Sequence, residues 1–491
     1  YKSIYEIIEL QDTLWVRTGS GLSFIIYDDI NSPLFYSIEN NNLPEGGSPA
    51  FFIDSNIMII SGSKAIYDNG AYRPMGTGIS WSTDKGNTWD FTEQSIDPNP
   101  DSGVYTYVTW GNQDSLRFKA ITTPIYNVSY DLELHNEYIY ATSFAGGIRR
   151  FDYTQDIPAW ELIPLPMDGQ DSLICNAVDV DTYEYDPVDP PEGNDNHKAF
   201  SIFIDDSYIW VGTGDGINRG TINEDCIDWM HYNEDDGLGD RWVVGIKKEI
   251  TDDLNRLWVI SWDPSINSPI PHNLSYTTDD GENWQFLSFF KDIGAIVYDL
   301  NFIDNDIYAS TSLGLYRTYN SDIDLWFKYD IEDINNQSSF TDAVYTSYKH
   351  TIENSDILWA GTLEGLFYSY DEGFSWLFYH ASNYGSFNVE ERLSDYPNPF
   401  YIDEHNQYQG DGYVRIAYYD AENNNNTKLD IFSFDMHHII NLNAPIMIGN
   451  GGQFTWNGRD EFNQQVSNGV YFCRLNLDGE IYWTKLMVIN S

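Results

Sequence analysis

Basic residues are scarce in this sequence. Against 76 Asp and Glu stand only 25 Lys and Arg, which gives a formal net charge of −51 over 491 residues. Because phosphate groups are bound by clustered Lys and Arg, this balance excludes nucleic acid and anionic lipid as partners. It favours an acidic surface that is simply solvated, and the alternative is a surface that binds divalent cations.

Cysteine and long apolar runs are scarce as well. The three cysteines, Cys175, Cys226 and Cys473, match no metal-binding spacing. Cys175 and Cys226 could form a disulfide if the chain is exported, but we expect buried free thiols. No apolar run approaches the roughly 18–20 residues of a membrane helix. No signal peptide is visible in the sequence and Tyr1 is not an initiator Met, so we expect that an N-terminal segment was removed or lies outside this sequence.

Sequence motifs of catalysis are also missing. The chain contains no nucleophile elbow, P-loop, dinucleotide fingerprint or H-E-x-x-H, and the "GTGDG" at Gly212 precedes no helical pattern. Acidic residues are so abundant that a glycosidase pair of carboxylates would carry no recognisable signature. The sequence therefore predicts no catalytic residue, although a hydrolase or lyase stays open as an alternative.

What the sequence does contain is a repeated apolar strand. It recurs as "LWVRTGSGL" from Leu14, "IWVGTGDGI" from Ile209, "IYASTSLGL" from Ile307 and "LWAGTLEGL" from Leu358, with further strands before and after each copy. About four short strands per roughly 50 residues, without helical periodicity, are typical of a β-propeller. We predict an all-β chain with a seven-bladed propeller over residues 1–385, with six or eight blades as alternatives.

A second repeat, S/T-x-D-x-G-x-x-W, occurs three times. Its residues are Ser82, Asp84, Gly86 and Trp89, then Thr277, Asp279, Gly281 and Trp284, then Ser369, Asp371, Gly373 and Trp376. The Asp can accept hydrogen bonds from its own turn, the Gly supplies a positive φ, and the Trp can bury its ring between sheets. We interpret the motif as a structural turn rather than a catalytic or metal site.

This motif resembles the Asp box of sialidases and sortilin-like propellers. In those families the box lies away from the active site, so the resemblance supports the fold and carries no information about activity. Sialidase chemistry would also need three arginines around one carboxylate. Six arginines could converge on a propeller axis, although their spacing does not show it: Arg17, Arg149, Arg150, Arg219, Arg241 and Arg317.

The C-terminal part differs from the repeats. Two prolines in "YPNPF", Tyr396 to Phe400, predict a stiff linker over residues 386–400. Alternating segments such as "YVRIAYYD" and "GVYFCRLNL" then predict a small immunoglobulin-like β-sandwich over residues 401–491.

This part resembles the C-terminal sorting domain of type IX secretion cargo, on the residues "YPNPF", "WNGRDEFNQQVSNGVYFCRL" and "TKLMVI". The resemblance implies the type IX secretion machinery as a partner, and a protein that is secreted or held at the outer cell surface. It implies sorting roles for Gly458, Arg459, Gly469 and Tyr471, whose alternative role is maintenance of the fold. Asn457 and Cys473 depart from the usual Asp and Tyr.

Two irregular segments, residues 92–136 and 165–200, interrupt the propeller repeats and could build a binding face. The second contains Asp179, Asp181 and Asp186, which are oxygen ligands of the kind that Ca²⁺ prefers. The spacing lacks the EF-hand order, so a solvated loop is the alternative.

Taken together, these patterns favour an exported propeller that binds a glycan or a surface protein. A secreted carbohydrate-active enzyme and a structural subunit of an extracellular assembly are the two alternatives.

Overall fold

The structure is a computed structural model. It describes residues 3–10, 13–19, 21–26, 34–37, 42–98, 100, 105–111, 114–177, 180–187, 194–223, 226–251, 254–264, 272–319, 322–331, 342–352, 355–363, 365–380, 393–396, 398–402, 413–419, 427–443, 445–447 and 451–489. The chain forms two compact units. The larger comprises Ile4–Tyr329 and Val344–His350, and the smaller comprises Tyr1–Ser3, Asp330–Ala343 and Thr351–Ser491.

Most sheets are meanders in which the strands lie in chain order. The first consists of β1 (Ile4–Leu10), β2 (Thr13–Thr18), β3 (Gly21–Ile26) and β4 (Leu34–Ser37). The second consists of β5 (Phe51–Ile53), β6 (Met58–Asp68), β7 (Ala71–Ser82) and β8 (Asp90–Thr92). The next consists of β11 (Ser129–His135), β12 (Tyr138–Ser143), β13 (Gly147–Asp152) and β14 (Glu161–Ile163). It is followed by β17 (Ala199–Ile204), β18 (Ile209–Thr213), β19 (Gly216–Ile222) and β20 (Ile227–Tyr232), with β15 (Ser172–Leu173) beyond β20.

The meanders continue with β21 (Trp242–Ile250), β22 (Asn255–Trp262), β23 (Asn273–Thr277) and β24 (Gln285–Leu287), and with β25 (Val297–Ile303), β26 (Asp306–Thr311), β27 (Gly314–Arg317) and β28 (Phe327–Lys328). The last consists of β29 (Val344–Ile352), β30 (Ser355–Thr362), β31 (Gly365–Ser369) and β32 (Leu377–His380). Short helical turns are η1 (Asp195–His197), η2 (Glu234–Asp236) and α1 (Phe289–Asp292).

The repeated apolar strands form the second strand of the meanders. All five residues of β18 are buried, and Trp210 at its centre is fully inaccessible. A strand covered on both faces by neighbouring sheets needs an unbroken apolar run rather than an alternating one. This explains why the sequence repeats "IWVGT"-like segments where each sheet packs between two others.

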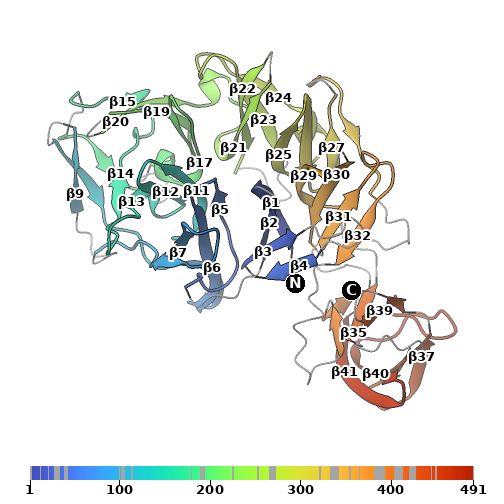
Figure 1. Cartoon of the computed structure of the whole chain (residues 1–491). Helices are drawn as coiled ribbons and strands as arrows, with labels where there is room; N and C mark the ends of the chain where they lie inside the picture. Colours follow the sequence, from blue (N-terminus) through green and yellow to red (C-terminus); the bar gives the residue numbers. More distant parts are fainter. Residues whose placement is uncertain are drawn as a thin grey trace. The chain divides into compact units, whose positions relative to one another are not determined.

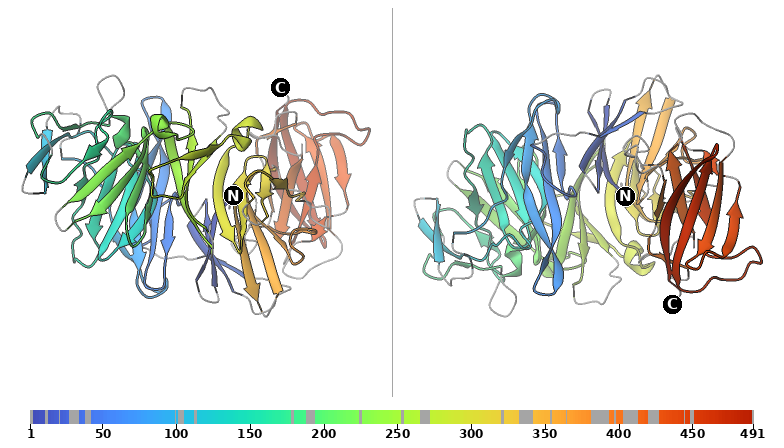
Figure 2. Two further views of the ribbon diagram at one scale, coloured as in Figure 1. Left: turned by 90° about the horizontal axis from the view of Figure 1, so that it is seen from above. Right: turned by 90° about the horizontal axis from the view of Figure 1, so that it is seen from below.

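Contacts link successive sheets of the larger unit into a closed circuit. On one side, Tyr348 of β29 donates a hydrogen bond to Glu9 of β1 (3.1 Å), and Thr346 donates one to Asp299 of β25 (2.9 Å). The remaining joints are Lys247–Asp299, Ser201–Val243, Ile202–Asp131, Ser61–Ser129 and Arg17–Ser48. Figure 1 shows the sheets of this unit following one another in chain order, and Figure 2 shows their strands running up and down side by side. The predicted all-β propeller class is therefore confirmed, while the number of blades stays a prediction.

The smaller unit contains a β-sandwich. One sheet has the order β33 (Leu393–Tyr396), β35 (Val414–Tyr419), β39 (Gly451–Trp456) and β38 (Ile446–Met447). The other has the order β34 (Phe400–Tyr401), β41 (Glu480–Ile489), β40 (Gly469–Leu477), β36 (Thr427–Ser433) and β37 (His438–Leu442). Alternate residues of β40, Tyr471, Cys473 and Leu475, point into the shared core.

Part of the predicted linker belongs to this sandwich. Within residues 386–400, β33 pairs with β35, and Phe400 begins β34, which pairs with β41. Phe400 is completely buried, so an apolar ring anchors the proline-containing segment to the core. Both strands lie at the edges of their sheets, and Pro399 stands between them, outside both ladders.

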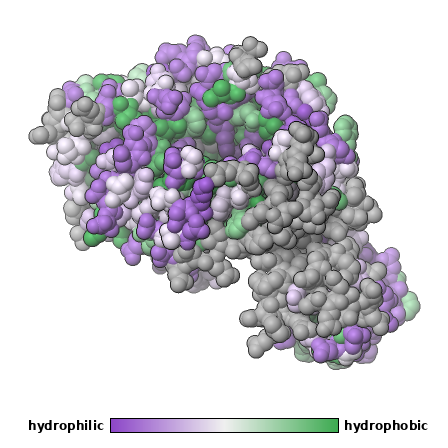
Figure 3. Space-filling model, in the orientation of Figure 1, coloured by the Kyte–Doolittle hydropathy of each residue, from purple (hydrophilic) through white to green (hydrophobic). Residues whose placement is uncertain are grey.

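No helix in the described ranges is long and apolar enough to cross a membrane. On the face drawn in Figure 3, hydrophilic residues predominate over the described surface, with hydrophobic residues scattered among them.

Candidate functional site

The three S/T-x-D-x-G-x-x-W turns repeat one hydrogen-bond pattern. In the first, the Ser82 hydroxyl donates to Asp84 (2.8 Å) and accepts from the Gly86 amide (2.8 Å). The Asp84 carboxylate accepts from the Thr88 amide and hydroxyl at 2.8 and 2.7 Å. The corresponding bonds recur at Thr277, Asp279, Gly281 and Asn283, and at Ser369, Asp371, Gly373 and Ser375.

These turns leave their carboxylates little capacity for chemistry. Hydrogen bonds from Thr88, Asn283 and Ser375 lower the pKa values of Asp84, Asp279 and Asp371, respectively. The glycines have φ values of 80°, 89° and 89°. Trp89, Trp284 and Trp376 are buried and stand directly before β8, β24 and β32. A carboxylate that is ionised and already accepts several hydrogen bonds is a poor general acid or base.

The two irregular segments of the propeller meet in one small sheet. The first segment supplies β9 (Tyr105–Trp110) and β10 (Asp114–Lys119), and the second supplies β16 (Glu184–Tyr185). We call this three-stranded sheet, with the order β16-β10-β9, the insert sheet. Its β10 and β16 pair in parallel, and Arg117 and Tyr105 both donate to Glu184 (2.8 and 2.6 Å).

A buried ion pair fixes the first segment to the propeller. The Arg149 guanidinium on β13 donates to Asp97 (2.6 Å), to Ser95 (2.7 Å) and to Thr122 (3.1 Å). The other Asp97 oxygen accepts from the Ile121 and Thr122 amides. Because both charges are buried and fully hydrogen-bonded, loss of either would leave the other unpaired, which is strongly destabilising.

A cleft of about 820 Å³ lies between the insert sheet and the neighbouring propeller sheets. It is lined by residues 92–98, by Thr106 to Trp110 of β9, by Phe118, by Arg149 and Arg150, and by residues 160–163 around β14. Tyr107 and Ile96, two of its apolar residues, are 67% and 53% exposed. β9 lies at the outer side of the larger unit in Figure 1. The cleft therefore combines exposed apolar side chains with strand edges.

A second, smaller cleft of about 480 Å³ shares Arg150 with the first. The Arg150 guanidinium lies 4.4 Å from the ring centre of Tyr138, and it also contacts Glu161 (2.9 Å). Asp205, Asp206 and Tyr208 also line this cleft.

The six arginines that could have formed a sialidase-like site all contact carboxylates. Their partners are Glu6 for Arg17, Asp97 for Arg149, Glu161 for Arg150, Glu282 for Arg219, Asp195 for Arg241 and Asp306 for Arg317. A substrate carboxylate would have to compete with each of these ion pairs. The pairing weighs against a site that binds an acidic sugar through arginines.

Of the three predicted calcium ligands, Asp179 lies outside the described residues. Asp186 is buried and its carboxylate accepts from Lys119 of β10 at 2.9 Å, so it ties β16 to the first segment. Asp181 is described, but nowhere in the described residues do three His, Cys, Asp or Glu side chains gather as metal ligands do. The calcium prediction therefore gains no geometric support from Asp181 and Asp186.

The second irregular segment contains a histidine that the sequence analysis passed over. His197, in η1, is fully buried, and neither ring nitrogen has a hydrogen-bond partner among the described residues. Its ring centre lies 4.0 Å from that of Tyr185. Burial, and then the nearby His231, lower the pKa of His197 to about 3. Only its position in an acidic, irregular segment distinguished it in the sequence.

Ionisable side chains also gather along the first strands of the meanders. Burial raises the pKa of Asp131 to about 6 and that of Glu133 well above its usual value. Burial alone would lower the pKa of Lys247, but the carboxylates of Asp299 and Glu6 raise it above its usual value. Neither of the two clefts is lined by these residues.

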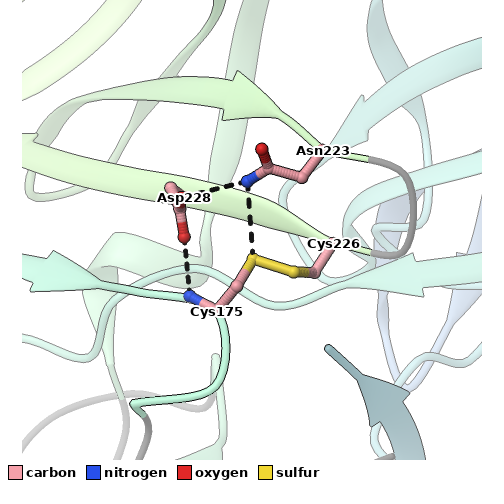
Figure 4. Close-up of a disulfide and its surroundings, with 4 residues drawn as sticks. All are labelled: Cys175, Asn223, Cys226 and Asp228. Atoms are coloured by element: carbon pink, nitrogen blue, oxygen red, sulfur yellow. Dashed lines mark hydrogen bonds between the residues drawn. A yellow bond between two sulfur atoms is a disulfide. The ribbon is translucent and has the colours of Figure 1, made fainter. Parts of the chain in front are cut away.

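The expectation of free thiols at Cys175 and Cys226 was wrong, because the two form a disulfide (Figure 4). β15 pairs with β20 through Leu173 and Trp229, which brings the flanking cysteines to a Cα–Cα distance of 6.2 Å. Asp228 accepts from the Cys175 amide (2.7 Å). Cys473 is a buried free thiol in the sandwich.

The four predicted sorting residues lie in two neighbouring parts of the sandwich. Gly458 (φ 73°) follows Trp456, whose indole donates to the Arg459 carbonyl at 2.8 Å. Arg459 donates to the Asn463 carbonyl (3.1 Å). Gly469 begins β40, and the Tyr471 hydroxyl donates to the Ser467 carbonyl (2.8 Å).

No family model and no curated protein matches the sequence. Solved structures that resemble it include PorZ, a surface component of the type IX secretion system of Porphyromonas gingivalis, with 10% identity and a TM-score of 0.36 over 99% of this chain and 66% of that chain. They also include the Swd1 β-propeller domain of Myceliophteria thermophila, with 10% identity and a TM-score of 0.41 over 74% of this chain and 97% of that chain. YCF48 from Cyanidioschyzon merolae matches with 12% identity and a TM-score of 0.41 over 78% of this chain and 96% of that chain. Matches at this level say nothing about ligand or activity.

Proposed function

We propose that this chain is an exported β-propeller that acts as an interaction module for a glycan or a protein at the outer cell surface. The observation that carries the proposal is the insert sheet, which two separate segments build jointly beside a cleft of about 820 Å³. Binding residues are concentrated in such insertions on a rigid scaffold. The carboxylates of the three turns add no support for a catalytic role, since each already accepts several hydrogen bonds.

Binding can be measured on intact cells and on a panel of soluble polysaccharides. We expect the labelled protein to bind a cell surface, and Tyr107→Asp to reduce that binding about tenfold. Phe374→Ala is the matched control, because Phe374 is 91% exposed and lies outside the cleft lining. Release of reducing ends from a polysaccharide would instead show the hydrolase alternative. Absence of binding to cells, glycans and surface proteins would contradict the proposal.

We further propose that the C-terminal sandwich directs export through the type IX machinery. The support is its resemblance to sorting domains, together with a two-sheet core to which the quoted motifs contribute Phe400, Trp456 and Tyr471. In a bacterium with this machinery, removal of residues 401–491 should retain the protein inside the cell. Export of the truncated chain at the normal level would contradict this route.

A further inference from the structure

Two strands that border the cleft stand at the ends of their sheets. β9 is the last strand in the order β16-β10-β9, and β14 is the last in β11-β12-β13-β14. Within the described residues, neither strand has a backbone partner on its outer side. An edge strand exposes a row of N–H and C=O groups that another extended chain can pair with.

The lining offers side-chain contacts that suit an extended chain. The residues of β9 alternate, with Tyr107 and Thr109 exposed while Val108 and Trp110 pack on the propeller core. Oxygen atoms of Gln94 and Thr106 are buried in the cleft wall without a hydrogen-bond partner among the described residues. A buried oxygen without a hydrogen bond costs free energy.

The charge of the site favours a basic ligand. In the lining, Arg149 neutralises Asp97 and Arg150 neutralises Glu161, which leaves the exposed Glu93 as the excess charge. The net charge of −51 on the whole chain would attract a cationic ligand and speed its association at low salt.

We propose that β9 binds an extended, basic peptide segment of a partner protein, which joins the insert sheet as an additional strand in the cleft between β9 and β14. This inference rests on the proposed role as an interaction module and specifies its ligand class. Main-chain pairing would supply affinity, and the exposed side chains of β9 would select the alternate residues of the peptide.

The experiment uses the full chain and labelled octapeptides. The probe alternates valine and lysine; one control alternates valine and glutamate, and another alternates glycine and lysine. We expect fluorescence anisotropy to show preference for the valine–lysine peptide, which weakens as salt is raised. Hydrogen exchange should slow at alternate amides between Tyr105 and Trp110, those that point away from β10, when this peptide is present.

Two neighbouring proline variants test the strand pairing directly. In an antiparallel pair, alternate residues direct their N–H groups to opposite sides, so only one of Tyr107 and Val108 offers its N–H to a new strand. We expect one of Tyr107→Pro and Val108→Pro to weaken binding about tenfold while keeping every hydrogen bond to β10, so that it lowers the melting temperature less than the other. The other should lower the melting temperature by removing a bond to β10. Glu93→Gln should reduce the salt dependence while leaving folding unchanged.

Equal binding of the valine–lysine and glycine–lysine peptides, or unchanged exchange along β9, would overturn the inference. If cells or glycans bind while the peptides do not, only strand addition fails. If wild-type protein binds neither cells, glycans nor peptides, the proposed function fails as well.

Discussion

Two glycines in the sandwich have different structural demands. Gly458 has φ of 73°, and a Cβ there would lie 2.4 Å from the Ile402 side chain. At Gly469 nothing lies within 4 Å of an added Cβ, and its φ is outside the region that favours glycine. Steric need therefore explains Gly458 but not Gly469.

Replacement of each glycine by alanine separates folding from sorting. We expect Gly458→Ala to destabilise the sandwich by about 1–3 kcal/mol, since a side chain would be strained and crowded. Gly469→Ala should change stability by less than about 0.5 kcal/mol. Urea unfolding followed by tryptophan fluorescence measures both. An equal loss of stability in the two variants would contradict this distinction. If the Gly469→Ala variant is fully stable but stays inside the cell, the export machinery recognises the region around Gly469.

His197 should make the larger unit sensitive to acid. The rings of Tyr183 and Tyr185 lie beside its ring, and the neighbouring ionisable side chain of His231 also opposes its protonation. In the unfolded chain it takes up a proton near pH 6.5, but in the folded chain only near pH 3. Between these values the unfolded state binds more protons, so stability falls as the pH is lowered.

We therefore expect His197→Phe to flatten the dependence of the melting temperature on pH between about 6.5 and 3. Asp131→Asn provides a control of opposite sign. The pKa of Asp131 is raised to about 6, so its contribution is present at low pH and is lost as the pH rises toward 6. An unchanged slope in His197→Phe would show that the ring gains a proton without unfolding.

At the scale of elements, the disulfide joins the second irregular segment to its propeller sheet. It closes a loop with a sequence separation of 51 residues. Loss of such a crosslink typically costs about 2–4 kcal/mol. We expect Cys226→Ser, or reduction of the wild type, to lower the melting temperature of the larger unit. Cys473→Ala should retain the sensitivity to reductant, because Cys473 is unpaired. A melting temperature that reductant does not change would contradict this prediction.

The elements differ in how far the sequence predicts them. Second strands such as β18 are predictable because burial on both faces forces the apolar run that the sequence repeats. The insert sheet is not, because Arg117 and Glu184 are far apart in the chain and β16 has only two residues. A long sequence separation likewise hid the disulfide between Cys175 and Cys226 from the sequence analysis. Local sequence patterns thus predict the propeller sheets, whereas the candidate site depends on strand pairing between two segments that are distant in the sequence.

At the scale of the whole molecule, charge dominates the solution behaviour. The isoelectric point is near pH 4.1. We expect solubility to be lowest near this pH, where repulsion between molecules vanishes, and to rise steeply above pH 5. Light scattering during a pH titration measures this change. A solubility minimum above pH 5 would mean that bound cations neutralise much of the acidic surface.

The dual origin of the insert sheet limits how this protein can be shortened. β10 is paired with β9 from its own segment and with β16 from a segment that follows another complete meander. Trimming the first loop would remove β9 and β10 and leave β16 without its partner, and trimming the second would remove β16 and expose the other edge of β10. A shortened protein therefore keeps the complete insert sheet only if both loops are kept.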